Sequence, residues 1–517
     1  MSNDFDQFRL GDSSANEMQR GMTRLTRYII DLPNRPVKDS WQDGQLLEEA
    51  GGLPEQGEPI EQTLDFFDRA IAPGMLPWNN PGFMGFFGTS APFPAIAANI
   101  LTTAHNSNRM VNAANPIASE LDELAGEWFR KFLNVPDSFA SQLFYSASQS
   151  HMHVLASTVN TRTKGLYRRG GIAATGQQFR IYKSQQAHFF VDKNAIAVGI
   201  GVGNVVDIKT DANGAMDPAA LAQSIEADLA NGYQPLMVVA TVGTTSSNAV
   251  DPVPAIANLC DQFDLFLYVD AAYAGAFASL PEYRWITDGW ERADAICINP
   301  HKQLMTPLGC SLLFLKDREA LRRTFVHGGA YIPDHPEDRP DPMDYTALCG
   351  MPMNSLALIF LMRTFGASGL RARLRNTLRL TKLFADMLRA DPIFEIIAPH
   401  PFTTICFRAK PALELDNSII DDFNARLARH VMDDADVFLS PTKLDGRTAL
   451  RLTIGNINTR SENVLSAFRA LRRSARTVGG FLSYKMTAPK TGRESFWERH
   501  GDDFLDADND IGFEPAA

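Results

Sequence analysis

Short apolar runs that end in polar residues recur along the middle of the chain. Three of these runs predict buried strands at Pro235–Thr245, Asp264–Gly275 and Ala293–Lys302. Over residues 93–360 such runs alternate with helix-like segments, and Cys310–Leu315 is the last strand of the series. This alternation predicts a large α/β domain, in which helices cover both faces of a parallel sheet.

The segments on either side of this domain have other patterns. Residues 1–92 contain a helical opening, a Gly/Pro-rich link and an amphipathic stretch. After the large domain, a helical run, two strand patterns and a further helix predict a small C-terminal α+β domain over residues 361–476. These elements lie at Leu356–Leu388, Phe402–Ala409, Ala449–Gly455 and Asn463–Arg473. Residues 477–517 are polar and acidic, and we expect them to form a tail with little apolar surface to bury.

Composition excludes some functional classes. Of the 517 residues 45% are hydrophobic and 21% are charged, which is ordinary for a soluble globular enzyme. A net charge of −11 without a Lys/Arg-rich run gives no footprint for nucleic acid. The apolar runs are shorter than the roughly 20 residues that a membrane helix needs, and the N-terminus lacks the apolar core of a signal peptide. We therefore expect a cytoplasmic protein without a membrane partner.

The sequence indicates neither a metal site nor a dinucleotide site. The five cysteines are scattered without CxxC spacing, and we interpret them as reduced core residues. His151 and His153 stand two residues apart, and on a helix such residues point to different sides. The glycine-rich run Gly199–Gly203 does not match GxGxxG, and no P-loop pattern occurs.

Two reactive side chains stand at the ends of predicted strands. Asp270 ends one apolar run, and Lys302 follows another in the tetrapeptide Asn299–Lys302. In open parallel sheets, ligands bind where the carboxyl ends of strands meet the loops. A lysine for a Schiff base and an acid for a pyridinium nitrogen fit pyridoxal phosphate (PLP). The alternatives are a surface lysine after a strand and an acidic helix N-cap.

An anion site is predicted in the segment Tyr145–Ser157. Its small residues Ser146, Ala147 and Ser148 precede a helical run. Helix N-termini bind phosphate groups through unpaired N–H groups and the helix dipole. Ordinary helix capping is the alternative interpretation.

The combination of AHFF at Ala187–Phe190, VDAAYAG at Val269–Gly275 and NPHK at Asn299–Lys302 is specific. By these motifs the chain resembles the PLP-dependent group II amino-acid decarboxylases, which include aromatic-L-amino-acid, glutamate and 2,4-diaminobutyrate decarboxylases. The matching stretches run from about Pro73 to about Thr459. The resemblance implies the aspartate aminotransferase-like PLP fold, type I. It also implies a homodimer with a shared active site, in which residues 1–92 pack across the partner subunit.

The resemblance assigns roles to the cofactor residues. Lys302 bonds covalently to PLP, Asp270 pairs with the ring nitrogen, and His188 and Ala272 lie against opposite faces of the ring. A lone histidine is otherwise more often structural. Around the ring and phosphate the set is completed by Ser146, Ala147, Ser148, Thr245, Asn299 and His301. The sequence departs from the family at Gln149, where a glutamate is usual.

The reaction type depends on a residue outside this set. Gly328–Asp344 is Pro-rich and polar, as in a loop that closes over a site. Tyr331 is in register with the family's catalytic-loop tyrosine, which returns a proton to Cα after carbon dioxide leaves; a loop tyrosine without a role is the alternative. Related aldehyde synthases typically alter this tyrosine or the stacking histidine. Because the chain keeps Tyr331 and His188, we expect decarboxylation of an L-amino acid to the amine.

An aromatic amino acid is the leading substrate expectation. Trp78, Phe87 and Thr89 match positions that line the pocket of the aromatic-acid decarboxylases, although buried aromatic residues are often simple core. Two departures favour a more polar substrate. One is the run Asn108–Met110. The other is CGMPMNSL at Cys349–Leu356, which carries Met351 and Asn354 in place of the family's arginine-bearing stretch before the next helix. The alternatives are a decarboxylase of a polar or acidic amino acid, an aldehyde synthase, and a PLP-binding scaffold without activity.

Overall fold

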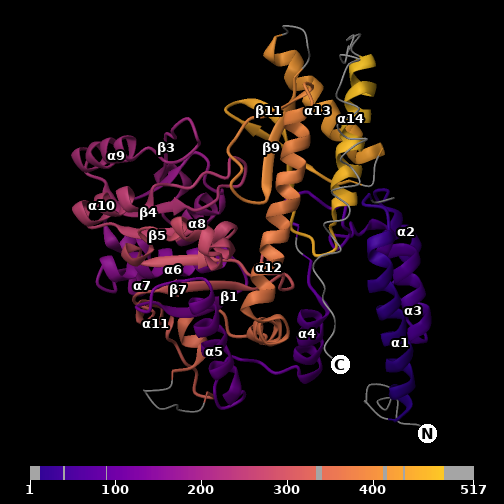
Figure 1. Cartoon of the computed structure of the whole chain (residues 1–517). Helices are drawn as coiled ribbons and strands as arrows, with labels where there is room; N and C mark the ends of the chain where they lie inside the picture. The colour runs from indigo at the N-terminus through magenta and orange to yellow at the C-terminus, as the bar shows by residue number, and fades with distance from the viewer. Residues whose placement is uncertain are drawn as a thin grey trace.

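The strand patterns of the middle of the chain form a seven-stranded sheet in the order β1-β7-β6-β5-β4-β2-β3 (Figure 1). The computed structural model describes residues 12–38, 41–88, 90–332, 340–410, 416–434 and 437–481. The strands of this sheet are β1 (Ala140–Phe144), β2 (Phe179–Ser184), β3 (Val205–Ile208), β4 (Gln234–Thr241), β5 (Phe266–Asp270), β6 (Ala295–Ile298) and β7 (Ser311–Leu315).

The sheet is mostly parallel, as predicted, but its strand β7 is reversed. β7 is the strand expected at Cys310–Leu315, and it pairs antiparallel with both β6 and β1. The physical reason lies in residues 299–310, which form turns between β6 and β7. Without a crossover helix the chain returns beside β6 in the opposite direction. The carboxyl ends of β1, β2, β4, β5 and β6 consequently share one edge of the sheet.

Helices cover both faces of this sheet (Figure 1). One face packs against α5 (Pro116–Phe132), α9 (Pro218–Ala230) and α10 (Val253–Phe263). The other face packs against α6 (Ala147–Arg162), α8 (Phe190–Val198) and α11 (Glu319–Phe325). The short helix α7 (Leu166–Gly170) follows α6, and α4 (Phe93–His105) packs against α12 (Ser355–Ala390).

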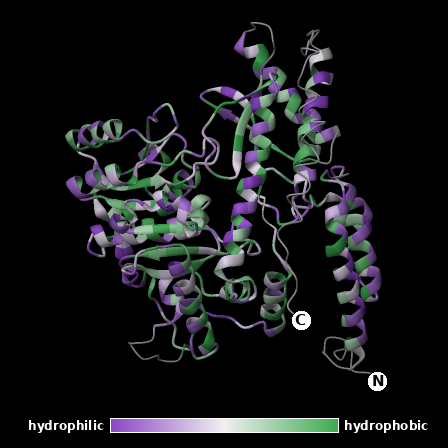
Figure 2. Ribbon diagram, in the orientation of Figure 1, coloured by the Kyte–Doolittle hydropathy of each residue, from purple (hydrophilic) through white to green (hydrophobic). Residues whose placement is uncertain are grey.

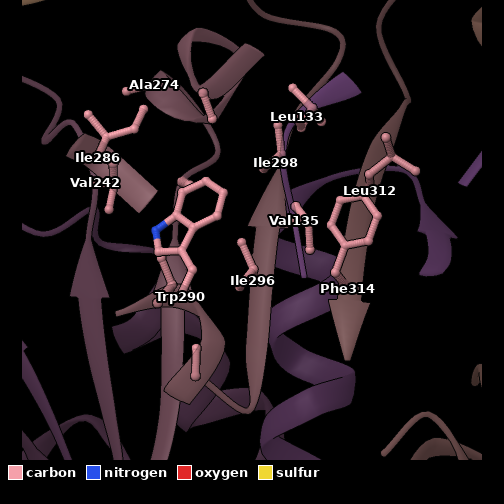
Figure 3. Close-up of a cluster of buried hydrophobic side chains, with 14 of the residues drawn as sticks. Leu133, Val135, Val242, Ala274, Ile286, Trp290, Ile296, Ile298, Leu312 and Phe314 are labelled. Carbon is pink, nitrogen blue, oxygen red and sulfur yellow. The ribbon is translucent and has the colours of Figure 1, made fainter. Parts of the chain in front are cut away.

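Alternation along the buried strands divides the apolar side chains between two cores. In β6, Ile296 and Ile298 belong to one core, whereas Ala295 and Cys297 belong to the other. Figure 3 shows the first of these cores, where Trp290 lies beside the isoleucines of β6. Fully burying a side chain of the size of Ile296 contributes about 2 kcal/mol. This double burial makes the sheet a rigid support for the loops at its edge.

The long helix α12 leads from the large sheet to a smaller one. It corresponds to the helical run predicted at Leu356–Leu388, and it is kinked at Gly366, where φ is 61°. No helix in the described ranges combines the length and apolar character that a membrane crossing requires.

The smaller sheet has four antiparallel strands in the order β10-β11-β9-β8. The predicted strands Phe402–Ala409 and Ala449–Gly455 correspond to β9 and β11, and the predicted helix Asn463–Arg473 lies within α14. Helices α13 and α14 pack against this sheet. The bounds are β8 (Phe394–Ile396), β9 (Thr404–Ala409), β10 (Ser440–Leu444), β11 (Arg447–Thr453), α13 (Asn417–Asp434) and α14 (Ser461–Phe481). Most of the predicted acidic tail, residues 482–517, lies outside the described residues.

The N-terminal helices stand beside the rest of the chain (Figure 1). They are α1 (Asp12–Asp31), α2 (Gln45–Ala50) and α3 (Ile60–Phe66). α1 is amphipathic, and hydrophobic and hydrophilic residues alternate along its ribbon (Figure 2). Its exposed apolar side chains are Met18, Met22, Leu25 and Ile30. Beyond these helices the chain joins the small sheet through two backbone hydrogen bonds of Met84. Met84 N donates to Phe438 O at 2.8 Å, and Met84 O accepts from Thr453 N at 2.8 Å.

Candidate active site

The carboxyl ends of β1, β4, β5 and β6 surround a cavity of about 180 Å³ at one edge of the large sheet. The predicted site residues that line it are Phe87, Ser146, Ala147, Ser148, His188, Thr245, Asp270, Ala272, Asn299, His301 and Lys302. Four further lining residues were not predicted, namely Phe190, Thr241, Gly243 and Tyr273. The structure therefore brings together side chains from segments far apart in the sequence.

Asp270 and Lys302 give the cavity one acid and one base. Asp270 ends β5, and its Oδ1 accepts a hydrogen bond from Ala272 N at 3.1 Å. Burial raises the pKa of Asp270, and the positive charge of Lys302 opposes this effect. Burial likewise lowers the pKa of Lys302, and the charge of Asp270 opposes it. Neither forms an ion pair with another described residue, so both remain available to a ligand.

The backbone holds Lys302 in a fixed turn after β6. Asn299 N donates to Ala272 O at 3.1 Å, which ties the end of β6 to the end of β5, and Lys302 N donates to Asn299 O at 3.0 Å. His301 Nδ1 accepts from Cys310 N at 3.2 Å, and burial lowers the pKa of His301 to about 4. His301 is therefore neutral at physiological pH.

An arginine from the small sheet reaches the same site. Arg451, in β11, donates from Nε to Thr245 O and from Nη1 to Phe86 O, each at 2.6 Å. Its Cζ lies 4.3 Å from the centroid of the Phe87 ring, and Lys302 Nζ lies 4.5 Å from that centroid. Burial lowers the pKa of Arg451 to about 10. A guanidinium and an amine thus flank one aromatic ring at the cavity. Arg451 was not among the residues predicted from the sequence.

His188 lies in the turn between β2 and α8. Its Nδ1 accepts a hydrogen bond from Phe190 N at 3.2 Å, and its ring stacks on Phe189 with the centroids 4.2 Å apart. Burial lowers the pKa of His188 and so favours the neutral imidazole. A flat, neutral ring on this wall and the methyl group of Ala272 suit a planar ligand between them.

The N-terminus of α6 forms the anion-binding wall. Ser146 is the N-cap, with its Oγ accepting from Gln149 N at 3.2 Å, and Gln149 Oε1 accepts from Tyr145 N at 2.9 Å. This pair resembles a capping box, except that Gln149 accepts from the residue before the N-cap; the bond needs only a side-chain acceptor, which glutamine and glutamate both have. Glutamine in place of the family's glutamate at position 149 therefore preserves the start of the helix. Ser146, Ala147 and Ser148 all line the cavity.

Two predicted residues that the structure describes, Trp78 and Tyr331, do not line this cavity within one chain. Trp78 is 41% exposed and stacks on Phe83 and Phe86, with centroids 4.7 and 5.7 Å away. Tyr331 is 81% exposed. Thr89 lies outside the described residues. Their roles remain predictions.

The polar segment expected to face the substrate makes internal contacts. Asn108 Oδ1 accepts from Met110 N at 3.0 Å and from Met351 N at 2.9 Å. Arg109 is buried and forms an ion pair with Asp122. Met351 is buried against Val111 and Met343, and Asn354 donates to Gly309 O. Within one chain the guanidinium of Arg109 is therefore already paired.

The two histidines set aside in the sequence analysis lie apart in the core. His151 packs edge-on against Phe190 and Tyr268, whereas His153 Nε2 accepts from Ala347 N at 2.9 Å. The cysteine interpretation needs one correction: Cys260, Cys297, Cys310 and Cys406 are buried, but Cys349 is exposed. Cys349 precedes α12 in a surface loop, where an apolar neighbourhood in the sequence does not imply burial.

The class of protein follows from the placement of Lys302 and Asp270 at adjacent strand ends, with a helix N-terminus across the cavity. This is the arrangement of a PLP-dependent enzyme of fold type I. A family model described as pyridoxal-dependent decarboxylase conserved domain matches residues 44–410. The chain belongs to this family.

Relatives cover nearly the whole chain. It is 30% identical over 481 residues to tryptophan decarboxylase 1 of Oryza sativa subsp. japonica, which spans 90% of this chain and 94% of the relative. It is 30% identical over 465 residues to phenylacetaldehyde synthase of Arabidopsis thaliana, with coverage of 87% and 93%. The crystal structure of Oryza sativa TDC with PLP and tryptamine superposes with a TM-score of 0.86 at 29% identity, covering 90% of this chain and 99% of that one.

The residues of the cavity fit PLP. The cofactor needs an amine for its aldehyde, an acid for its ring nitrogen and N–H groups for its phosphate, and the lining supplies Lys302, Asp270 and the start of α6. Asp270 is buried and Lys302 is partly buried, and neither has an ion-pair partner among the described residues, which is costly unless a ligand compensates them. The protein is a PLP-dependent amino-acid decarboxylase.

Proposed function

We propose that this enzyme decarboxylates an aromatic L-amino acid, with tryptophan as the first substrate to test, to the corresponding amine and carbon dioxide. The observation that carries the proposal is Phe87 in the cavity wall, 4.5 Å from Lys302 Nζ. An aromatic surface beside the reactive amine suits an aromatic side chain. The relative that decarboxylates tryptophan and the structure with tryptamine support this choice.

The proposed roles follow from the positions of the side chains. Lys302 carries the covalent bond to PLP, which supplies an electron sink when bound. Asp270 keeps the pyridine nitrogen protonated, because a carboxylate beside it favours the charged form. His188 and Ala272 hold the ring from its two faces, and the N–H groups at the start of α6 bind the phosphate.

Tyr331 is proposed as the acid that delivers a proton to the α-carbon of the substrate after carbon dioxide leaves. Its 81% exposure in one chain fits a residue that acts at a neighbouring subunit. The proposed homodimer covers the apolar face of α1, where Met18 and Ile30 are 59% and 66% exposed. The partner's loop then completes the site. A cytoplasmic location also belongs to this proposal.

An aldehyde synthase is the second candidate, and its support is the likeness to phenylacetaldehyde synthase. That reaction consumes oxygen and releases aldehyde, ammonia and hydrogen peroxide together with carbon dioxide. A chain that keeps Tyr331 and His188 favours the amine.

The test is a carbon dioxide release screen over the common amino acids, 2,4-diaminobutyrate, DOPA and 5-hydroxytryptophan, with amine, aldehyde and peroxide measured in parallel. We expect the highest kcat/KM with an aromatic substrate, equimolar amine and no peroxide. Preference for a polar or acidic substrate contradicts the substrate assignment. Equimolar peroxide and aldehyde contradict the amine product, and bound PLP without turnover on any substrate identifies an inactive scaffold.

A further inference from the structure

A second cavity, of about 480 Å³, opens on the surface of the large domain beside the small sheet. Its walls are mainly apolar and include Trp285, Pro399 and Pro401. Trp285 is 46% exposed, and its ring lies parallel to the buried ring of Phe402 with the centroids 6.4 Å apart. The indole is therefore held in place from behind and presents its other face outward.

The charged residues that line this cavity are all acidic. Asp211 and Asp217 line it, and its lining contains no lysine, arginine or histidine within the described part of the chain. Each carboxylate uses Oδ1 for backbone N–H groups: Asp211 accepts from Asn213 and Ala215, and Asp217 accepts from Ala219 and Ala220. Neither forms an ion pair with a described residue, and both belong to the same lining as the aromatic ring of Trp285.

A buried polar group in the same lining has no partner. Asn248 is fully buried, and its Nδ2 donates to Thr404 O at 2.9 Å. Its Oδ1 has no hydrogen-bond partner among the described residues. A buried acceptor left unpaired in this way destabilises the folded protein, so a ligand with an N–H donor would relieve the cost.

The same turn connects this cavity to the active site. Gly243 and Thr245 line the cofactor cavity, whereas Asn248, Ala249 and Val250 line the second one. Gly243 N and Thr244 N both donate to Ala249 O at 3.0 Å, which locks the two sides of the turn together. A ligand on one side of the turn thus contacts the back of the active-site wall.

We propose that the second cavity binds a primary ammonium ion carried on an apolar body. Carboxylates attract the ammonium group, the unpaired Asn248 Oδ1 accepts one of its N–H bonds, and the face of Trp285 attracts both the cation and an aromatic body. The amine product is a ligand of this class, and this last identification rests on the proposed function. Binding of the product here would report its concentration to the turn that carries Thr245.

The test uses holoenzyme reduced with borohydride, so that the active site cannot capture an amine covalently. Radiolabelled tryptamine is titrated in equilibrium dialysis. We expect one saturable, Trp285-dependent site per chain, with the dissociation constant raised about tenfold or more by Trp285→Ala. The double variant Asp211→Asn with Asp217→Asn should have a similar effect, since asparagine keeps the Oδ1 acceptors and removes only the charge. Glu226→Gln, on the exposed face of α9, is the matched control and should bind as the parent does.

Indole-3-ethanol, which has the same body without the ammonium group, should bind at least tenfold more weakly than tryptamine. Absence of a Trp285-dependent site, or equal affinity in the parent and the asparagine double variant, overturns the proposal. Circular dichroism and the visible absorption of bound PLP establish that each variant is folded. The binding experiment measures no turnover. Its outcome is therefore independent of whether the decarboxylation screen identifies an aromatic substrate.

Discussion

The cofactor cavity and the predicted substrate-facing residues differ in how much of the site one chain supplies. Lys302 and Asp270 lie at adjacent strand ends and are held by backbone hydrogen bonds within a doubly covered sheet. Trp78 and Tyr331 lie outside that cavity and are 41% and 81% exposed. The contrast indicates that cofactor chemistry is built by a single fold, whereas substrate choice and proton return are proposed to depend on a second subunit.

The largest expected effect is that of Lys302→Ala. The variant should fold and bind PLP at most non-covalently, and its turnover should fall by about 10⁴-fold or more because the covalent attachment is lost. Visible absorption and carbon dioxide release measure the two effects. Lys316→Ala, an exposed lysine at the end of β7, is the control and should retain both properties. Substantial turnover by Lys302→Ala would contradict the proposed covalent attachment of PLP to Lys302.

Asp270→Asn should keep the fold and PLP but lower kcat by about 10²–10³-fold, because an amide cannot hold the ring nitrogen protonated. Asp294→Asn is the matched control. Asp294 lies at the opposite edge of the same sheet, where its Oδ2 accepts from Leu267 N, a bond that asparagine can keep. Activity of Asp270→Asn within about twofold of the parent would show that catalysis does not depend on the Asp270 carboxylate.

Tyr331→Phe tests the other side of the comparison. Substrate binding should survive, while amine formation falls by about 10²-fold because the general acid is gone. With oxygen as the co-reactant, the product should become aldehyde, with ammonia and hydrogen peroxide. Product analysis by chromatography measures the change. Amine release at the parental rate would make the tyrosine a bystander.

A hybrid dimer shows whether the site is shared. One subunit carries Lys302→Ala and the other carries Tyr331→Phe, with different affinity tags for purification. If Tyr331 acts across the interface, one of the two sites is intact and the hybrid should have about half of the parental activity. If the hybrid is no more active than the two homodimers that each carry a single substitution, Tyr331 acts in the site of its own subunit.

Gln149→Glu should have the smallest effect. Glutamate retains the acceptor for Tyr145 N, so the start of α6 is preserved. The added negative charge near the anion-binding wall should weaken PLP binding by less than about threefold, since water and the helix dipole moderate it. Equilibrium dialysis of PLP measures the change. A loss of more than about thirtyfold would show that the glutamine is required for the phosphate site.

The cofactor-binding residues could be predicted from the sequence because each is marked by the residues directly beside it in the chain. Asp270 and Lys302 each follow an apolar run, and the period of those runs predicts buried strands whose ends meet. Ser146 marks a helix start by residue type alone. The lining residues Thr241 and Tyr273 lie within or beside the predicted motifs, yet their side-chain direction depends on register, which the pattern did not fix.

The rest of the site depends on long-range packing. Arg451 reaches Thr245 from a strand of the other sheet, and nothing in the sequence around it shows that contact. The reversal of β7 was missed because Ser311–Leu315 has the same apolar pattern in either direction. Arg109 was expected at a polar substrate wall, but within one chain Asp122 pairs with it.

The most direct test of the central claim is to reduce the native holoenzyme with borohydride and map the peptide that carries the pyridoxyl group. The cavity lining contains one lysine in the described chain, and Asp270 beside it completes the cofactor site. We predict one modified peptide, labelled at Lys302, in a yield close to one per chain. A pyridoxyl group on any other lysine would contradict the assignment of the whole site.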